Sequence, residues 1–262
     1  MKISVIMQTF LGDYPGARTK PKEKFIRAVN SFLAQHHQEK ELVIVSDGCE
    51  ITKKMYELFF SDEEEIRFCY IDRNLEKEKS MYIEDDGLIH YRGTPREVGR
   101  AIATGDLITY FDSDDIMLPN RLSDLNEFWK TVPANVQWSS NPIRLVHEKI
   151  LNLDREDWKE SKTRIGDVSI DVKNLTTQKK EKFIMNLMVP EGYVACASYA
   201  LCHRKDVKVK WRNLTKPKNN HDDHKYPSED TMFLQEMQDA GAGIRQESPS
   251  IIICHYRNLW DV

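Results

Sequence analysis

The sequence lacks the features that mark membrane, secreted or repetitive proteins. Within its 262 residues, no window approaches the ~18 consecutive apolar residues that a membrane-spanning helix needs. Residues 1–16 contain one early lysine and only a short apolar run, so we expect a first strand there and no signal peptide. No internal repeat or low-complexity tract occurs in the sequence. What remains is an ordinary globular protein, which we expect to form a single domain over residues 1–262.

Cysteine is also scarce, and its five positions are scattered along the chain. No C-x-x-C pair occurs among them. An odd and dispersed set of cysteines is typical of reduced thiols, so the sequence predicts a cytoplasmic location.

A large excess of one charge is missing as well, since 38 Lys+Arg stand against 42 Asp+Glu, giving a net charge of -4. The chain is therefore not a polycation that binds nucleic acid through its overall charge. Residues 204–218 are a local exception, with Asp206 as their one acidic residue and these basic ones: Arg204, Lys205, Lys208, Lys210, Arg212, Lys216 and Lys218. Such a run is usually a solvated face, which is the interpretation we favour.

The first half of the chain alternates between strand and helix patterns. Apolar runs predict strands at residues 3–7, 41–48, 66–71 and 106–111, and apolar spacing predicts helices at 22–37, 53–60 and 94–105. Thr94 followed by Glu97 is typical of a capping box, and Gly105 is expected to end that helix. The alternation predicts an α/β fold with a mainly parallel sheet and helices on both faces.

The second half is less regular, but no linker separates it from the first. Helices are predicted at residues 121–132 and 227–241, a buried strand or strand pair at 189–207, and a late strand at 250–256. Residues 72–94 are polar and without a period, and we interpret them as an irregular excursion across the surface.

Polar residues follow three of the predicted strands at the points where these strands end. Thr9 closes the first strand, Ser46 and Asp47 close the second, and residues 112–115 follow the fourth. Because the carboxyl ends of parallel strands meet at one edge of a sheet, ligands collect there. The sequence therefore predicts a binding site at this edge.

Three carboxylates, those of Asp112, Asp114 and Asp115, occupy four positions directly after an apolar run. Carboxylates at i and i+2 can point into the same crevice, and hard oxygen donors suit Mg or Mn ions. Aspartate is also common in turns and at helix N-caps, so the pattern taken alone favours a solvated turn.

Two segments of the second half carry further candidates. Glu229 and Asp230 open a predicted helix, where the macrodipole favours acidic residues, or where one of them acts as a general base. His255 is a candidate metal ligand only if its strand ends beside the aspartates. His221 and His224 have the spacing of a metal site but the setting of a surface loop.

The order and spacing of these motifs resemble the family-two nucleotide-sugar glycosyltransferases, which have the GT-A fold. Thr9 and Phe10 match the Thr-Tyr pair that ends the family's first strand, and "SDGC" matches its Asp-Asp-Gly-Ser. "PREVGRAIATG" matches its Ala-Arg-Asn-x-Gly helix, and "FDSDD" matches its Leu-Asp-x-Asp-Asp motif. The Glu-Asp of its acceptor half is matched by "SED". Two departures are Ser46, where the family has Asp, and Glu97, where it has Asn.

The resemblance implies a metal-dependent transferase that inverts the anomeric carbon of a nucleotide-sugar donor, with UDP as the usual nucleotide. It implies a donor half at residues 1–115 and an acceptor half at 116–262. The implied donor-binding residues are Thr9, Phe10, Asp47, Arg96, Asp112 and Ser113. The implied ligands of Mn or Mg are Asp114 and His255, and the implied catalytic base is Asp230. A saccharide is the family's usual acceptor.

Three alternatives stay open. A nucleotidyltransferase also uses metal carboxylates on an α/β sheet, but its Gly-rich basic loop is matched only loosely by "QTFLGDYPGARTK". A non-catalytic binding module would retain the fold without turnover. The basic segment 204–218 contains Trp211, and basic residues with a stacking aromatic ring suit a hydroxylated base in DNA as acceptor. The oligomeric state is not determined by the sequence.

Overall fold

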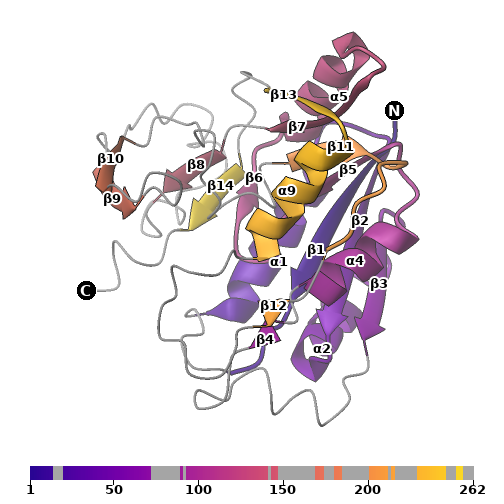
Figure 1. Ribbon diagram of the computed structural model, residues 1–262. Helices are drawn as coiled ribbons and strands as arrows, with labels where there is room; N and C mark the ends of the chain where they lie inside the picture. Colours follow the sequence, from indigo (N-terminus) through magenta and orange to yellow (C-terminus); the bar gives the residue numbers. More distant parts are fainter. Residues whose placement is uncertain are drawn as a thin grey trace.

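The computed structural model describes residues 1–13, 20–71, 89–90, 93–140, 143–146, 169–173, 180–184, 201–211, 214–215, 229–245 and 252–255. Its centre is a seven-stranded sheet (Figure 1) with the strand order β13-β7-β11-β5-β1-β2-β3. In chain order these strands are β1 (Ile3–Thr9), β2 (Lys40–Asp47), β3 (Ile66–Ile71), β5 (Leu107–Tyr110), β7 (Val136–Ser140), β11 (Leu201–Arg204) and β13 (Ala242–Arg245).

The sheet is mainly parallel, with one reversed strand. Strands β5, β1, β2 and β3 pair in parallel, as do β13 and β7, whereas β11 is antiparallel to both of its neighbours. Every residue of β2 before Asp47 is buried, as expected for a strand that is covered on both faces. The predicted fold class, a mainly parallel mixed sheet flanked by helices, is confirmed.

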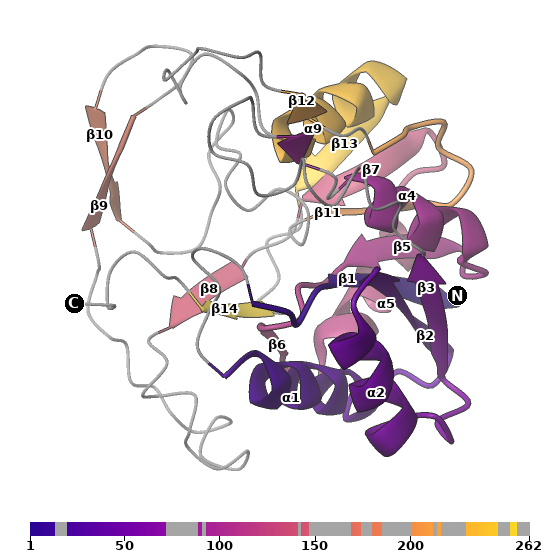
Figure 2. The ribbon, with the colours of Figure 1, turned by 90° about the horizontal axis from the view of Figure 1, so that it is seen from below.

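Helices cover both faces of this sheet. They are α1 (Pro21–Leu33), α2 (Glu50–Phe59), α4 (Gly93–Ile102), α5 (Arg121–Thr131) and α9 (Glu229–Ala240). Helices α1, α2 and α5 bury Phe25, Met55 and Leu125 in one hydrophobic cluster. Helix α9 buries Phe233 and Met237 in a second cluster, which also contains residues of β1, β2 and β5. Figure 2 shows α1 and α2 on one side of the sheet and α4 and α9 on the other.

Helix α4 packs closely on the sheet through Gly99. A Cβ atom at this position would lie 3.2 Å from Cγ2 of Val45 and closer still to the side chain of Ile6. The predicted capping box at the start of this helix is wrong, because the helix begins at Gly93 and Thr94 is its second residue. Glu97 instead forms an ion pair of 2.6 Å with Arg100.

The C-terminal end of α4 also differs from the prediction. The helix ends at Ile102, and Gly105 lies beyond it, where its backbone N–H donates to Ser4 Oγ at 2.8 Å. A Cβ atom on Gly105 would lie 2.7 Å from the backbone nitrogen of Ser4. Gly105 therefore allows the chain to approach the start of β1, which is a different role from ending a helix.

Within the described residues, three smaller sheets lie outside the central one. β6 (Ile116–Met117), β14 (Ile252–His255) and β8 (Ile143–Val146) form a three-stranded sheet in the order β6-β14-β8. The two-stranded pairs are β4 (Ile89–His90) with β12 (Leu214–Thr215), and β9 (Ser169–Lys173) with β10 (Lys180–Ile184). Apart from β4, the predicted excursion before α4 lies outside the described residues. The same is true of His221 and His224.

Both halves of the chain contribute to the central sheet: β1, β2, β3 and β5 precede residue 115, and β7, β11 and β13 follow it. The division into a donor half and an acceptor half stays a prediction. Cys49, Cys69 and Cys202 are free thiols. Of the helices within the described ranges, none is long and apolar enough to cross a membrane.

Candidate active site

Three strand ends meet at one edge of the central sheet. Thr9 ends β1 and lies opposite Ser46 in the parallel register with β2, and Ile6 of β1 lies opposite Tyr110 at the end of β5. Since β1 is the middle strand of the three, the polar residues that follow β2 and β5 come out on either side of Thr9. The structure thus brings Thr9, Asp47 and the aspartates after β5 to the same edge.

A tight turn carries the three aspartates directly beyond β5. The backbone N–H of Asp115 donates to the carbonyl oxygen of Asp112 at 3.2 Å, which closes the turn. Arg27 of α1 donates from Nη2 to the carbonyl oxygen of Asp114 at 2.9 Å. Strand β6 follows at once and returns the chain to the core. The turn is therefore held by strands β5 and β6 at its two ends and by Arg27 of helix α1.

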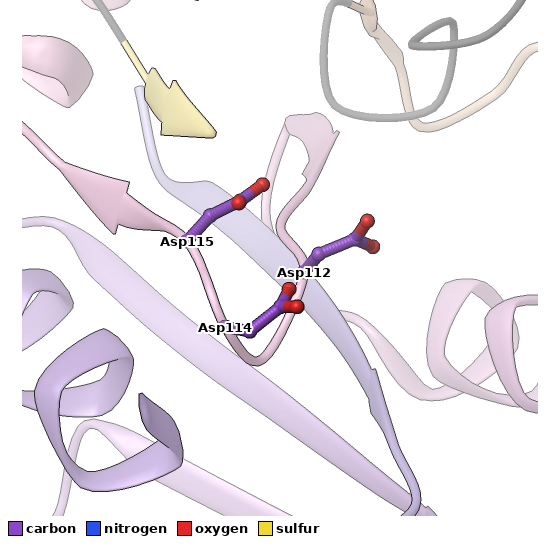
Figure 3. A group of neighbouring side chains, drawn as sticks. All are labelled: Asp112, Asp114 and Asp115. Carbon is purple, nitrogen blue, oxygen red and sulfur yellow. The ribbon is translucent and has the colours of Figure 1, made fainter. Parts of the chain in front are cut away.

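The carboxylates of Asp112, Asp114 and Asp115 form a compact group (Figure 3), with one oxygen of each within 4.8 Å of the others. Asp115 is buried, with 2% of its surface exposed, whereas Asp112 and Asp114 are partly exposed. Negative charges held so close together repel one another, and a divalent cation between them would relieve that repulsion. Three hard oxygen ligands are the donor set that Mg²⁺ and Mn²⁺ prefer.

Thr9 offers a further polar atom at this edge. Its side chain is buried, with 3% of its surface exposed, and its Oγ1 has no hydrogen-bond partner among the described residues. A buried hydroxyl without a partner costs free energy, and a bound ligand would supply the missing partner. The residues present thus fit a site for a metal ion with a polar ligand.

Arg96 lies on helix α4, which covers the face of the sheet opposite to α1, and its side chain reaches the group of three carboxylates. Its Nη2 lies 3.7 Å from Oδ1 of Asp112, and its guanidinium lies over the ring of Trp211, 4.5 Å from the ring centroid. Only 5% of the surface of Arg96 is exposed. The cation therefore offsets part of the negative charge of the three carboxylates.

The residues after β1 and β2 have different surroundings. Phe10 is partly buried against the core cluster beneath α1, and Asp47 is partly exposed ahead of Gly48, whose φ of 66° is left-handed. Ser46 is fully buried, and its Oγ accepts from the backbone N–H of Cys49 at 3.3 Å. Ser46 thus holds the turn into α2, and Asp47 is the more exposed residue of this pair. Ser113 lies in the aspartate turn and is partly exposed.

The two candidates from the end of the chain lie on elements near this edge. Asp230 lies in the first turn of α9. Strand β14 is antiparallel to β6, with Ile253 opposite Ile116, so it runs alongside the residue that follows Asp115. His255 ends β14 two residues beyond that pair, and Figure 3 shows the yellow arrow of β14 beside Asp115. The strand thus ends beside the aspartates, as a metal ligand at His255 would require. The directions of the Asp230 and His255 side chains stay predictions.

The basic segment does not present Trp211 to solvent. Trp211 is buried, with 4% of its surface exposed, and stacks on Phe233 of α9 with 3.9 Å between ring centroids. The interpretation of Trp211 as a ring that stacks on a nucleic-acid base is therefore wrong, because its faces are taken up within the protein. Lys205, Lys208 and Lys210 are exposed, in agreement with a solvated face.

A buried hydrogen-bonded pair lies behind the aspartate turn. The hydroxyl of Tyr110 lies 2.9 Å from Nε2 of His203, and His203 Nδ1 lies 2.7 Å from the carbonyl oxygen of Arg204. If Nδ1 donates to that carbonyl, Nε2 accepts from the tyrosine, so the neutral imidazole satisfies all three groups. Burial lowers the pKa of His203 to about 4 and raises the pKa of Tyr110.

Sequence reasoning missed two contributors to the site and left a third without a role. Arg27 is separated from Asp114 by 87 positions, and nothing in its local sequence distinguishes it from other helical arginines. For Trp211, the basic neighbours predict an exposed ring, whereas the structure places the ring against Arg96. Asp115 belongs to the predicted cluster without a predicted role as a ligand, although it is the most buried of the three aspartates.

Comparisons with known proteins bear on the fold. No protein-family model matches the chain. An uncharacterized glycosyltransferase of Nostoc sp. (strain PCC 7120) is 27% identical over 222 residues, which make up 81% of this chain and 56% of that protein.

Two solved structures share the architecture. The crystal structure of S. aureus TarS 1–349 in complex with UDP-GlcNAc matches with a TM-score of 0.58 and 16% identity, covering 98% of this chain and 59% of the other. The mannosyltransferase PcManGT from Pyrobaculum calidifontis, in complex with GDP-Man and Mn²⁺, matches with a TM-score of 0.55 and 9% identity, covering 99% and 58%. This chain spans less than two thirds of the length of each of these three relatives. The resemblance to nucleotide-sugar glycosyltransferases is confirmed, and the chain has their GT-A fold.

Proposed function

We propose that this protein is a metal-dependent, inverting glycosyltransferase that moves a sugar from a nucleoside-diphosphate donor to an acceptor hydroxyl. The observation that carries the proposal is the group of three carboxylates within 4.8 Å of one another, at the carboxyl edge of the parallel strands. Ligands in such folds bind at this edge. Oγ1 of the buried Thr9, at the same sheet edge, has no hydrogen-bond partner within the described ranges, and a bound ligand would explain this as well.

Solved structures with the same fold support the class of donor. TarS binds UDP-GlcNAc in one crystal structure and UDP in another, and the mannosyltransferase PcManGT binds GDP-Man together with Mn²⁺. We propose a UDP-sugar as the donor of this chain and Mn²⁺ or Mg²⁺ as its metal ion.

The donor would be held by residues at the three strand ends. Thr9, Phe10 and Asp47 are the proposed contacts of the base and ribose, partly through backbone groups. Asp112 and Ser113 support the ribose and the metal shell, with Arg96 beside Asp112 as a cation near the phosphates.

Asp114 and His255 are the proposed metal ligands, and Asp115 is close enough to join them. A bound divalent cation would neutralise the diphosphate as it leaves, acting as a Lewis acid. The chain's own part is to hold three carboxylates in a fixed turn, so that little reorganisation is needed when the ion binds.

The acceptor hydroxyl would lose its proton to Asp230, in the first turn of α9. The hydroxyl oxygen attacks the anomeric carbon from the face opposite the nucleotide while its proton passes to Asp230, the bond to the diphosphate breaks, and the configuration inverts. A carboxylate is an adequate base because the hydroxyl becomes more acidic as the new bond forms.

A saccharide is the proposed acceptor, bound by residues of the second half. A hydroxylated base in DNA is the weaker alternative, because its recognition by this chain relied on Trp211 as a stacking ring, and that ring is buried. Exposed lysines supply phosphate contacts but no aromatic face on which a base could stack.

The proposal is tested by the release of nucleoside diphosphate from UDP-GlcNAc, UDP-glucose and GDP-mannose in the presence of Mn²⁺ and a panel of oligosaccharides. We expect one donor to be turned over, and Asp230→Asn to abolish the transfer while nucleotide binding persists. Asp62→Asn, which changes an exposed aspartate in the turn after α2, is the matched control and should retain full activity. If Asp230→Asn transfers sugar at the wild-type rate, the assignment of the base is wrong.

A further inference from the structure

A column of three side chains joins the aspartate turn to helix α9. Phe233 of α9 stacks on Trp211 with 3.9 Å between centroids and 10° between the ring planes. The guanidinium of Arg96 lies over the same indole, 4.5 Å from its centroid, and Nη2 of Arg96 lies 3.7 Å from Oδ1 of Asp112. A ring stacked at 3.9 Å leaves no room for a guanidinium on that face, so Arg96 and Phe233 lie on opposite faces of the indole.

Trp211 is itself held firmly in this column. Its backbone N–H donates to Oε2 of Glu97 at 3.1 Å, one residue along α4 from Arg96. Its ring also meets Tyr110 edge to face, with 5.1 Å between centroids. Tyr110 is the last residue of β5, two positions before Asp112. The indole therefore contacts both the arginine that faces Asp112 and the strand that leads to it.

The burial of the column determines how the arginine can be oriented. Arg96 and Trp211 have 5% and 4% of their surfaces exposed, so water contributes little to holding the guanidinium in place. A flat cation on an aromatic face is attracted by the ring and confined to a plane parallel to it. Without the indole, the guanidinium would retain its charge but lose the aromatic surface that confines it to one plane.

We propose that Trp211 is a positioning residue for the donor site: it orients the Arg96 guanidinium, which in turn orients the carboxylate of Asp112. This inference rests on the proposed function, because it assigns the role to the metal and nucleotide site described above. The column continues to Phe233, three residues after Asp230, so it also joins the proposed base to the proposed metal shell.

The competing explanation is that Trp211 only fills the core. A positioning role and a core-filling role are distinguished by the affinity of the purified protein for Mn²⁺ in the presence of UDP. This affinity is measured from the loss of the electron paramagnetic resonance signal of free Mn²⁺. The variants are Trp211→Leu, which removes the aromatic face, Trp211→Phe, which retains one, and Arg96→Lys, which retains the charge without the planar group. Urea unfolding of each variant reports stability separately.

A matched control is available in the same chain. Trp129 is also buried, with 3% of its surface exposed, and also carries an arginine, Arg204, at 5.1 Å from its ring. It lies on α5, in the hydrophobic cluster on the other face of the sheet. Trp129→Leu should therefore cost as much stability as Trp211→Leu without changing the affinity for Mn²⁺.

We expect Trp211→Leu to weaken the affinity for Mn²⁺ with UDP about tenfold, which corresponds to about 1.4 kcal/mol. Trp211→Phe should stay within about threefold of the wild type, since it retains a face for the guanidinium. In the double variant with Arg96→Lys, the two losses should not add, because both substitutions disturb the same contact.

An unchanged affinity in Trp211→Leu, or an equal loss in Trp129→Leu, would overturn the inference. If Trp211→Leu does not fold, Arg96→Lys tests the same contact, because it retains the charge but not the planar group that lies on the indole. An unchanged affinity for Mn²⁺ in Arg96→Lys would then overturn the inference. A wild-type protein that binds no Mn²⁺ with UDP or GDP would instead refute the proposed function on which the inference rests.

Discussion

The buried His203 gives the fold a specific sensitivity to acid. Burial lowers its pKa from 6.5 to about 4 in the folded protein, while the imidazole regains its ordinary pKa when the chain unfolds. Between these two values the unfolded state binds a proton that the folded state does not. Stability is therefore complete above pH 6.5 and falls as the pH is lowered from 6.5 towards 4.

The magnitude follows from the two pKa values. At about 1.4 kcal/mol per pKa unit, the difference between 6.5 and about 4 corresponds to about 3 kcal/mol of unfolding free energy, most of it lost by pH 4.5. This is a large part of the ~5–15 kcal/mol that holds a typical domain folded. The loss is expected because protonation would place a cation beside Arg100 in a buried site.

The test compares wild type with His203→Gln in urea unfolding experiments at several pH values between 7.5 and 4.5. Glutamine can accept from Tyr110 and donate to the carbonyl of Arg204, as His203 does, but it does not titrate. The wild type should lose about 2.5 kcal/mol more than the variant over this range. Equal pH dependence in the two proteins would refute the reasoning, because other groups would then account for the acid sensitivity.

Two further substitutions test the packing and the ion pairs of the sheet. Gly99→Ala should destabilise the protein by about 1–3 kcal/mol, since the added methyl group meets Val45 and Ile6, and urea unfolding measures the loss. Glu41 is buried, which alone would raise its pKa, but hydrogen bonds from Ser4, Thr104 and Lys2 lower that pKa to about 2. Its stabilisation is present above pH 4.5 and is lost as the pH falls to 2, so Glu41→Gln should cost about 2 kcal/mol at pH 7 and flatten that part of the pH profile.

Much of the fold could be predicted because it depends on patterns that are local in the sequence. The continuous apolar run of β2 and the helical spacing of Phe25, Val29 and Phe32 each reflect one buried surface, and both elements begin within one residue of the prediction, although the helix ends at Leu33. The predicted start of α4 was wrong because the spacing of Thr94 and Glu97 fits a capping box whether or not the helix begins there. In the folded chain, Arg100 and the backbone N–H of Trp211 both donate to the Glu97 carboxylate.

The aspartate group could be predicted because its members are close in sequence, directly after a strand. The roles of Arg27 and Trp211 could not be predicted in the same way, because each residue contacts a partner that is far away in the sequence. Arg27 contacts Asp114, and Trp211 contacts Arg96. For Trp211 a signal did exist. Val207, Val209 and Trp211 are buried while Lys208 and Lys210 are exposed, a period of two that is typical of an extended segment with one buried face. Lys208 and Lys210 lie on the exposed face of this segment, and Trp211 lies on its buried face.

The most direct measurement of the central claim is thermal unfolding with Mn²⁺ and a panel of UDP, GDP, ADP and CMP, for wild type and Asp114→Asn. A nucleotide at ~100 times its dissociation constant should add about 2.7 kcal/mol of stability, a shift of several degrees in the midpoint for a chain of this size. The account predicts that one diphosphate raises the midpoint only when Mn²⁺ is present, and that Asp114→Asn abolishes the shift. A wild-type protein whose midpoint does not move with any nucleotide would contradict the account, and the three aspartates would then be no more than a solvated turn.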